Sequence, residues 1–146
     1  MRILVINGPN LNLLGIREPA VYGQESYADL CAKITAYARE KDVGISFFQS
    51  NHEGALVDAI QAAYGSFDGI VINPGAYTHT SIALLDAVKA VGTPTVEVHI
   101  SDVNAREAFR KTSFVRAACI GTIAGHGTDG YLEAIELLMR MGGAHA

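Results

Sequence analysis

The residues best suited to proton transfer are Glu97 and His99, two positions apart in the stretch VEVHIS at residues 96–101. In a strand, side chains two residues apart point to the same side, so this carboxylate and imidazole would face each other. A carboxylate beside an imidazole fixes its tautomer and raises its basicity, which prepares a histidine to transfer protons. A purely structural pair in the core or at a sheet edge fits the same spacing, so both interpretations stay open.

Two arginines, Arg106 and Arg110, lie four residues apart in the segment 104–111, which its pattern predicts to be a short helix. Side chains at this spacing share a helix face, so two guanidiniums would point the same way and favour an anionic ligand such as a carboxylate. The alternative is an exposed face on which Glu107 and Lys111 form a surface pair.

Tyr22 lies in the segment GPNLNLLGIREPAVYG, residues 8–23, which we expect to be a long loop without structure of its own and of the kind that forms lids. A free tyrosine has a pKa of about 10, so only about 0.1% is ionised at neutral pH. A nearby Arg17 would favour the phenolate, and each unit of pKa depression requires about 1.4 kcal/mol. A tyrosine that only packs on the loop is the competing interpretation.

These residues need a scaffold, and the hydrophobic pattern predicts strands that alternate with helices. The expected strands are residues 2–7, 45–49, 69–73, 95–100 and 117–124, and the expected helices are residues 26–42, 53–64, 80–91, 104–111 and 130–141. Such alternation predicts an α/β fold, a flavodoxin-like three-layer sandwich with a five-stranded parallel sheet in the order 2-1-3-4-5.

In that strand order the segments that follow strands one, three and four meet in one crevice, where open parallel sheets bind ligands. The crevice would collect an unusually polar set of side chains. Its members are Asn10, Asn12, Arg17, Tyr22, Asn73, His79, Asp86, Glu97, His99, Ser101, Arg106 and Arg110.

Length and charge restrict the partners. The chain has 146 residues, which fits a single domain, residues 1–146, and its net charge of -4 with dispersed Lys and Arg argues against binding to nucleic acid or to a membrane surface. The first apolar run, residues 3–6, is too short for a secretory or membrane segment. We interpret Cys31 and Cys119 as reduced thiols, which favours a cytoplasmic location. Small molecules or further copies of this chain are the expected partners.

Cofactors and metals are not expected. The stretch GHGTDG at residues 125–130 matches a dinucleotide-binding pattern, but only one helix follows it, so we interpret it as a tight turn between a strand and a helix. No HxxxH, CxxC or carboxylate cluster suggests a metal site. The four lysines fall at polar positions of expected helices, which argues against an imine mechanism.

Three segments together closely resemble the type II dehydroquinases, the 3-dehydroquinate dehydratases of the shikimate and quinate pathways. They are GPNLNLLGIREPAVYG, NPGAYTHTS and VEVHISDVNAREAFR, in this order and at these spacings, and the resemblance spans nearly the whole chain. The resemblance implies dehydration of 3-dehydroquinate to 3-dehydroshikimate through an enolate, without a cofactor. Biosynthetic and catabolic enzymes share this reaction, so the pathway stays open.

The same resemblance assigns catalytic roles. Tyr22 would take the proton α to the ketone, with Arg17 favouring its phenolate, and Asn10 would hold a water that polarises the enolate oxygen. His99, oriented by Glu97, would protonate the leaving hydroxyl as a general acid.

Further positions match substrate-binding residues of the family: Asn73, His79, Asp86, Ile100, Ser101 and Arg110. In the family the aspartate that matches Asp86 serves a neighbouring subunit's site, which implies trimers that assemble into a dodecamer. Arg106 is expected to be an electrostatic helper only.

Other functions fit less well. A flavodoxin would need a hydroxyl-rich phosphate loop after the first strand, and GPNLNLLG contains no hydroxyl. A phosphoacceptor receiver domain would need acidic residues there and a lysine after the fifth strand. A pure binding module would bind dehydroquinate in the same crevice without turning it over.

Overall fold

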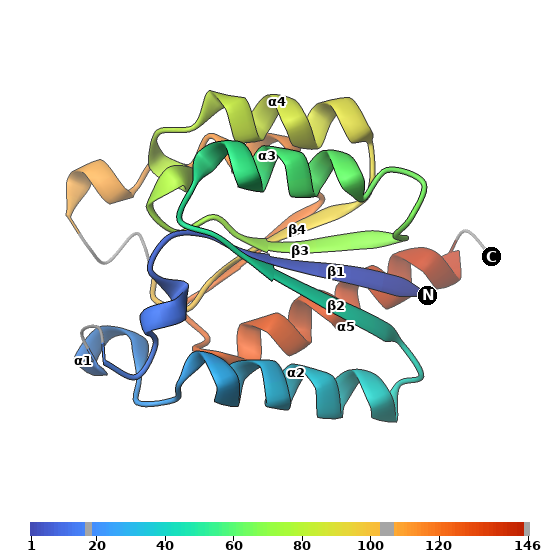
Figure 1. Ribbon diagram of the computed structural model, residues 1–146, viewed down its shortest axis with the longest axis horizontal. Helices are drawn as coiled ribbons and strands as arrows, with labels where there is room; N and C mark the ends of the chain where they lie inside the picture. The colour runs from blue at the N-terminus through green and yellow to red at the C-terminus, as the bar shows by residue number, and fades with distance from the viewer. Residues whose placement is uncertain (17–18, 103–106, 145–146) are drawn as a thin grey trace.

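The protein is a three-layer α/β sandwich (Figure 1), seen in a computed structural model that describes residues 1–16, 19–102 and 107–144. Its sheet has the order β2-β1-β3-β4-β5, and all neighbouring strands are parallel. The strands are β1 (Arg2–Asn7), β2 (Gly44–Gln49), β3 (Gly69–Asn73), β4 (Thr95–His99) and β5 (Gly121–Ala124). The predicted fold class and strand order are therefore confirmed.

Helices cover both faces of the sheet. Helices α2 (Tyr27–Glu40) and α5 (Asp129–Ala144) pack on one face, and α3 (Glu53–Ala62) and α4 (Ile82–Val91) pack on the other (Figure 1). This double cover explains why β3 is buried along its whole length and why its sequence GIVIN is apolar up to the last residue. Each fully buried Ile or Val in it contributes about 1.5–3 kcal/mol.

The helix ends are fixed by local sequence. Ser26 and Asp29 form a reciprocal capping box at the start of α2, and the Ser81 hydroxyl accepts a hydrogen bond of 3.0 Å from the backbone N–H of Leu84 at the start of α4. Gly92 ends α4 in the left-handed region, with φ of 67°. Both helices therefore begin and end within a residue or two of the predicted positions.

The expectation of a structureless loop at residues 8–23 is wrong. The segment contains the 3-10 turn η1 (Leu11–Leu13) and the short helix α1 (Pro19–Tyr22). Leu11 and Leu14 are buried in the core cluster beneath α2, so their apolar side chains hold the first half of the segment against the protein.

Two boundaries after β4 also differ from the prediction. Within the helix predicted over 104–111, residues 108–110 form the 3-10 turn η4 (Ala108–Arg110), and residues 104–106 lie outside the described part. The expected strand at 117–124 begins only at Gly121, because the preceding apolar residues form the 3-10 turn η5 (Val115–Ala118). Ala118 and Cys119 pack against the core cluster that contains the buried residues of α4, which accounts for the apolar character that resembled a strand.

A buried polar network links the ends of the two central strands. Asn7 and Asn73 are register partners at the carboxyl ends of β1 and β3. The hydroxyl of Tyr131 donates to Oδ1 of Asn7 at 2.6 Å and accepts from Nδ2 of Asn73 at 2.9 Å. Burial raises the pKa of Tyr131, so the hydroxyl stays protonated. The network fixes α5 to the position where the strand order reverses.

Removal of the Tyr131 hydroxyl should destabilise the fold. Tyr131→Phe removes the hydrogen bonds that the hydroxyl makes to Oδ1 of Asn7 and Nδ2 of Asn73, and we expect a loss of about 1–3 kcal/mol in the free energy of unfolding. Urea denaturation at matched protein concentration measures the change, with Tyr64→Phe as control because Tyr64 is 71% exposed. Equal stabilities for the two variants would contradict a structural role for the network.

Candidate active site

Glu97 and His99 face each other at the carboxyl end of β4. Nε2 of His99 lies 3.4 Å from Oε1 of Glu97, and the glutamate side chain has no exposure to solvent. This contact confirms that the two side chains point to the same side. The imidazole is nearly buried, with 5% of the residue exposed. A carboxylate thus faces one nitrogen of a shielded ring at the edge of the sheet where ligands bind in this type of fold.

Four further groups hold the Glu97 carboxylate, and none was in the predicted site. Oε2 accepts hydrogen bonds from the hydroxyls of Thr78 at 2.7 Å and Ser113 at 2.6 Å. Oε1 accepts from Nε of Arg116 and from the Thr122 hydroxyl, each at 3.3 Å. These partners come from η2 (Gly75–His79), the segment before η5, η5 itself and β5. The carboxylate therefore joins four separate segments.

The hydrogen bonds decide the charge of Glu97. Burial by itself raises the pKa of a carboxyl group, but the facing His99 and the hydroxyls of Ser113 and Thr78 outweigh that effect and lower the pKa to about 2. Burial and the charge of Glu97 also raise the pKa of the Cys119 thiol to about 12. At neutral pH the site therefore contains an ionised carboxylate and a protonated thiol.

Asn10 lies at the same edge of the sheet, in the turn after β1. Its φ of 70° places it in the left-handed region, where asparagine is among the residues that tolerate the conformation. Its backbone N–H donates to Oδ1 of Asn51 at 3.0 Å, and Nε2 of Gln49 donates to the same oxygen at 3.3 Å. Gln49 and Asn51 thus support the Asn10 turn, although the sequence gave no reason to single them out.

Asn73 and His79 are held in fixed orientations. Oδ1 of Asn73 accepts from the backbone N–H of Gly75 at 3.1 Å, while its Nδ2 donates to Tyr131. Nδ1 of His79 lies 2.7 Å from the carbonyl oxygen of Thr112. Because a carbonyl only accepts, Nδ1 of His79 carries the proton, and Nε2 is the other ring nitrogen for a ligand.

Ile100 and Ser101 line a pocket of about 380 Å³ beyond the end of β4. Its other lining residues are Val21, Gly23, Glu25, Asp102, Gly125, Gly127 and Thr128. The turn at residues 125–130 wraps around this end, since the backbone N–H of Gly127 donates to the Ile100 carbonyl at 3.1 Å. The interpretation of GHGTDG as a strand-to-helix turn is confirmed.

The segment around α1 borders the same pocket, through Val21 and Gly23, and lies where the strands end (Figure 1). Tyr22 is the last residue of α1. Its side chain, like Arg17 and Arg106 as a whole, lies outside the described part of the structure. The predicted shared face of Arg106 and Arg110 is therefore not seen.

Two further predicted site residues lie on α4 and η4. Asp86 is exposed in the middle of α4, on the outer surface of the helical layer. Nε of Arg110, on η4, lies 2.8 Å from Oε2 of Glu107, which is a different pair from the predicted alternative between Glu107 and Lys111.

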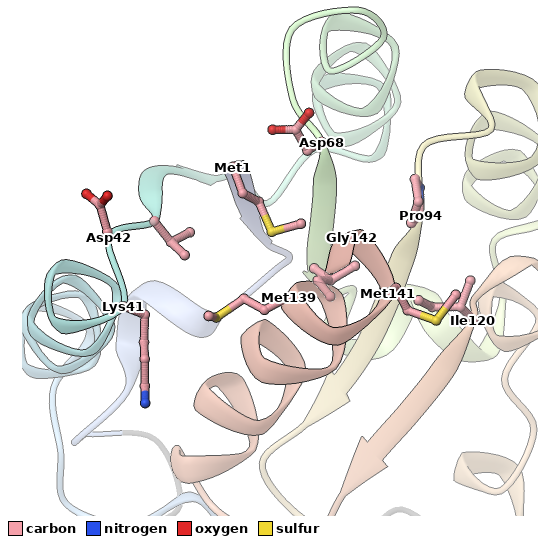
Figure 2. A pocket seen from close by; sticks show the side chains of 11 residues that line it. Met1, Lys41, Asp42, Asp68, Pro94, Ile120, Met139, Met141 and Gly142 are labelled. Carbon is pink, nitrogen blue, oxygen red and sulfur yellow. The ribbon is translucent and has the colours of Figure 1, made fainter. Parts of the chain in front are cut away.

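A larger cavity of about 630 Å³ lies at the opposite end of the sheet (Figure 2). Figure 2 shows Met1, Met139 and Met141 around it, with Pro94 and Ile120. Pro94 directly precedes β4, so the cavity is at the amino ends of the strands, away from His99. Its lining is mostly apolar and brings no acid–base pair together, so we assign the chemistry to the carboxyl edge.

Among the described residues there is no group of three or more His, Cys, Asp or Glu side chains that could hold a metal ion. The same part of the chain includes no helix with the length and apolar character needed to cross a membrane. Cys31 and Cys119 are both free thiols.

Comparisons with known proteins agree on one family. The profile of the family described as dehydroquinase class II matches residues 1–139. A 3-dehydroquinate dehydratase from Fusobacterium nucleatum is 56% identical over 142 residues, which is 95% of this chain and 97% of that protein. A catabolic 3-dehydroquinase from Verticillium alfalfae is 55% identical over 139 residues, 95% of this chain and 93% of the relative. The crystal structure of a type II dehydroquinase from Butyrivibrio crossotus superposes with a TM-score of 0.94 at 53% identity, covering 95% and 97% of the two chains.

The low pKa of Glu97 predicts a specific loss of stability in acid. A carboxyl whose pKa falls from 4.5 to about 2 on folding stabilises the protein above pH 4.5, and this contribution of about 3 kcal/mol is lost as the pH falls toward 2. Glu97→Gln lacks the titrating group, so its stability should fall less steeply over this range. Urea unfolding at a series of pH values measures both slopes, and parallel curves for the two proteins would refute a buried ionised Glu97.

Proposed function

The chain belongs to the class II dehydroquinase family, and from this premise we propose that it is a hydro-lyase that removes water from 3-dehydroquinate to give 3-dehydroshikimate. The observation that carries the proposal is the Glu97–His99 pair, buried at the carboxyl edge of the sheet, where the next two residues of the chain, Ile100 and Ser101, line a pocket. Relatives named for the general reaction and for its catabolic use are almost equally similar, so both pathway roles are part of the proposal.

The first step that we propose is removal of the proton α to the ketone by the phenolate of Tyr22, which leaves an enolate. Val21 and Gly23 line the pocket, so the backbone of α1 supports a position for Tyr22 at its mouth. Arg17 is the group that we assign to lowering the pKa of Tyr22. A shift from about 10 to about 7 requires roughly 4 kcal/mol, which a shielded guanidinium within a few Å can supply.

The second step is loss of the hydroxyl as water, with His99 as the general acid. The enolate electrons form the carbon–carbon double bond, the carbon–oxygen bond breaks, and the proton from His99 leaves with the oxygen. Because Nε2 of His99 faces Glu97, we assign the proton transfer to Nδ1. The ionised carboxylate stabilises the imidazolium before transfer and keeps the ring in one orientation.

The remaining residues bind the substrate in this proposal. The backbone at Ile100 and the hydroxyl of Ser101 receive the substrate carboxylate, and Asn10 holds the water that stabilises the enolate oxygen. Asn73, His79 and Arg110 contact the hydroxyl groups on the substrate ring and the charge of the substrate. The fixed amide of Asn73 and the single free nitrogen of His79 support these roles because both groups are oriented before substrate arrives.

We propose that Asp86 acts between subunits. Its exposure on α4 supports a contact with the site of a neighbouring copy, in a trimer that assembles into a dodecamer. Arg106 is proposed only as an electrostatic helper. The two free thiols support a cytoplasmic location, and the match over residues 1–139 supports a single catalytic domain.

The direct test is ultraviolet absorbance after the protein is mixed with 3-dehydroquinate, since the product is a conjugated enone. We expect the enone band to grow with metal-free protein and to grow equally after treatment with borohydride, which reduces imines. A band lost after borohydride would overturn the imine-free route. If the folded protein binds dehydroquinate but produces no enone band, the protein is a binding module and not an enzyme.

Tyr22→Phe removes the base but keeps the ring. We expect turnover to fall by about 10²–10⁴-fold while the dissociation constant for 3-dehydroquinate stays within a few-fold, because the hydroxyl acts on a proton rather than in binding. Steady-state kinetics and calorimetric titration measure the two quantities. Turnover close to wild type would remove Tyr22 from the role of base.

His99→Ala removes the general acid. We expect a loss of turnover of about 10²–10⁴-fold, since a hydroxyl leaves poorly without a proton. His126→Ala is a matched control, because His126 is an exposed histidine paired with Glu133 at 2.7 Å on the surface. The assignment would be contradicted if both alanine variants turned over substrate at the same rate.

A further inference from the structure

Arg116 and His99 contact the same oxygen of the buried carboxylate. Nε of Arg116 lies 3.3 Å from Oε1 of Glu97, and Nε2 of His99 lies 3.4 Å from that atom. The arginine comes from η5, a different segment from the strand that carries the other two residues. The guanidinium of Arg116, whose charge is permanent, therefore contacts the same carboxylate oxygen that faces His99.

This arrangement affects how strongly His99 binds its proton. A carboxylate paired with histidine alone favours the imidazolium, whereas a guanidinium on the same oxygen offsets part of the negative charge and repels a second positive charge. Arginine stays protonated across the working range of pH, so its effect does not change during turnover. A general acid must release its proton and regain it in every cycle. Its proton affinity therefore has to lie between the effect of the carboxylate, which raises it, and the effect of the guanidinium, which lowers it.

We propose that Arg116 is a positioning residue for the general acid, which holds Oε1 of Glu97 and thereby limits the proton affinity of His99. The catalytic role of Arg116 rests on the proposed function. Its effect on the proton affinity of His99 does not, because that effect is a property of the folded protein. Arg116 touches no reacting atom in this account and acts only through Glu97.

The groups that face Glu97 come from every element around it. Among the described residues, the ionisable ones are His99 on β4, Arg116 on η5 and Cys119 just after η5. Cys119 is uncharged at neutral pH because its thiol pKa is about 12. Thr78, Ser113 and Thr122 contribute hydroxyls without charge. Within the described part of the chain, Arg116 is therefore the permanently charged group that touches the carboxylate.

The test is a titration of the His99 ring by NMR in protein with ¹³C-labelled histidine, with the His99 signal identified from its absence in His99→Asn. Arg116→Met removes the charge and keeps the aliphatic stem. We expect the pKa of His99 to rise by roughly half a unit to one unit, the lower part of the usual range because the Arg116 side chain is 39% exposed. Arg116→Lys keeps the charge and should stay closer to wild type.

Arg39→Met is the matched control, since it removes one exposed arginine from the end of α2. Its effect on His99 should be below about 0.2 unit because distant surface charges are screened. A second readout is the pH profile of kcat, whose alkaline limb should move up with the His99 pKa in Arg116→Met and not in Arg39→Met. A general loss of stability would lower activity without moving that limb.

Equal His99 pKa values in Arg116→Met and Arg39→Met, or a lower value in Arg116→Met, would overturn the proposal. If Arg116→Met does not fold, Arg116→Gln is titrated in its place with the same expectation. The NMR titration needs no turnover. A protein without dehydratase activity would refute the proposed function while the effect of Arg116 on His99 could still be measured.

Discussion

A carboxylate without access to water must find all its partners inside the protein, and Glu97 imposes this constraint on the whole edge of the sheet. Its two oxygens take hydrogen bonds from Thr78, Ser113, Arg116 and Thr122, and one of them faces His99. An unpaired buried charge would cost several kcal/mol, so these segments must assemble together. The same requirement fixes the imidazole at the carboxyl edge of the sheet.

The sheet supplies the frame for that carboxylate. Parallel pairing places the ends of β1, β3 and β4 at one edge, and the Tyr131 hydroxyl connects Asn7 to Asn73 between the first two. Layers of helices pack on both faces of this sheet. Two buried polar clusters therefore hold this edge together, one around Tyr131 and one around Glu97.

Strand periodicity was sufficient to predict the fold, its strand order and the facing of Glu97 and His99, because each depends on local pattern and on general rules of parallel sheets. Thr122 could have been added, since it is the register partner of Glu97 on β5. Ser113 and Arg116 could not, because they reach Glu97 from irregular segments whose path depends on tertiary packing. The apolar residues before β5 resembled a strand for the same reason: Ala118 and Cys119 pack against the cluster beside α4 and do not pair in the sheet.

The most direct measurement is a crystal structure of Tyr22→Phe with 3-dehydroquinate bound. The account predicts the substrate carboxylate on the backbone and hydroxyl at Ile100 and Ser101, and the departing hydroxyl within hydrogen-bond distance of His99 while that ring still faces Glu97. Substrate in the apolar cavity beside Met139, or a His99 ring turned away from Glu97, would contradict it.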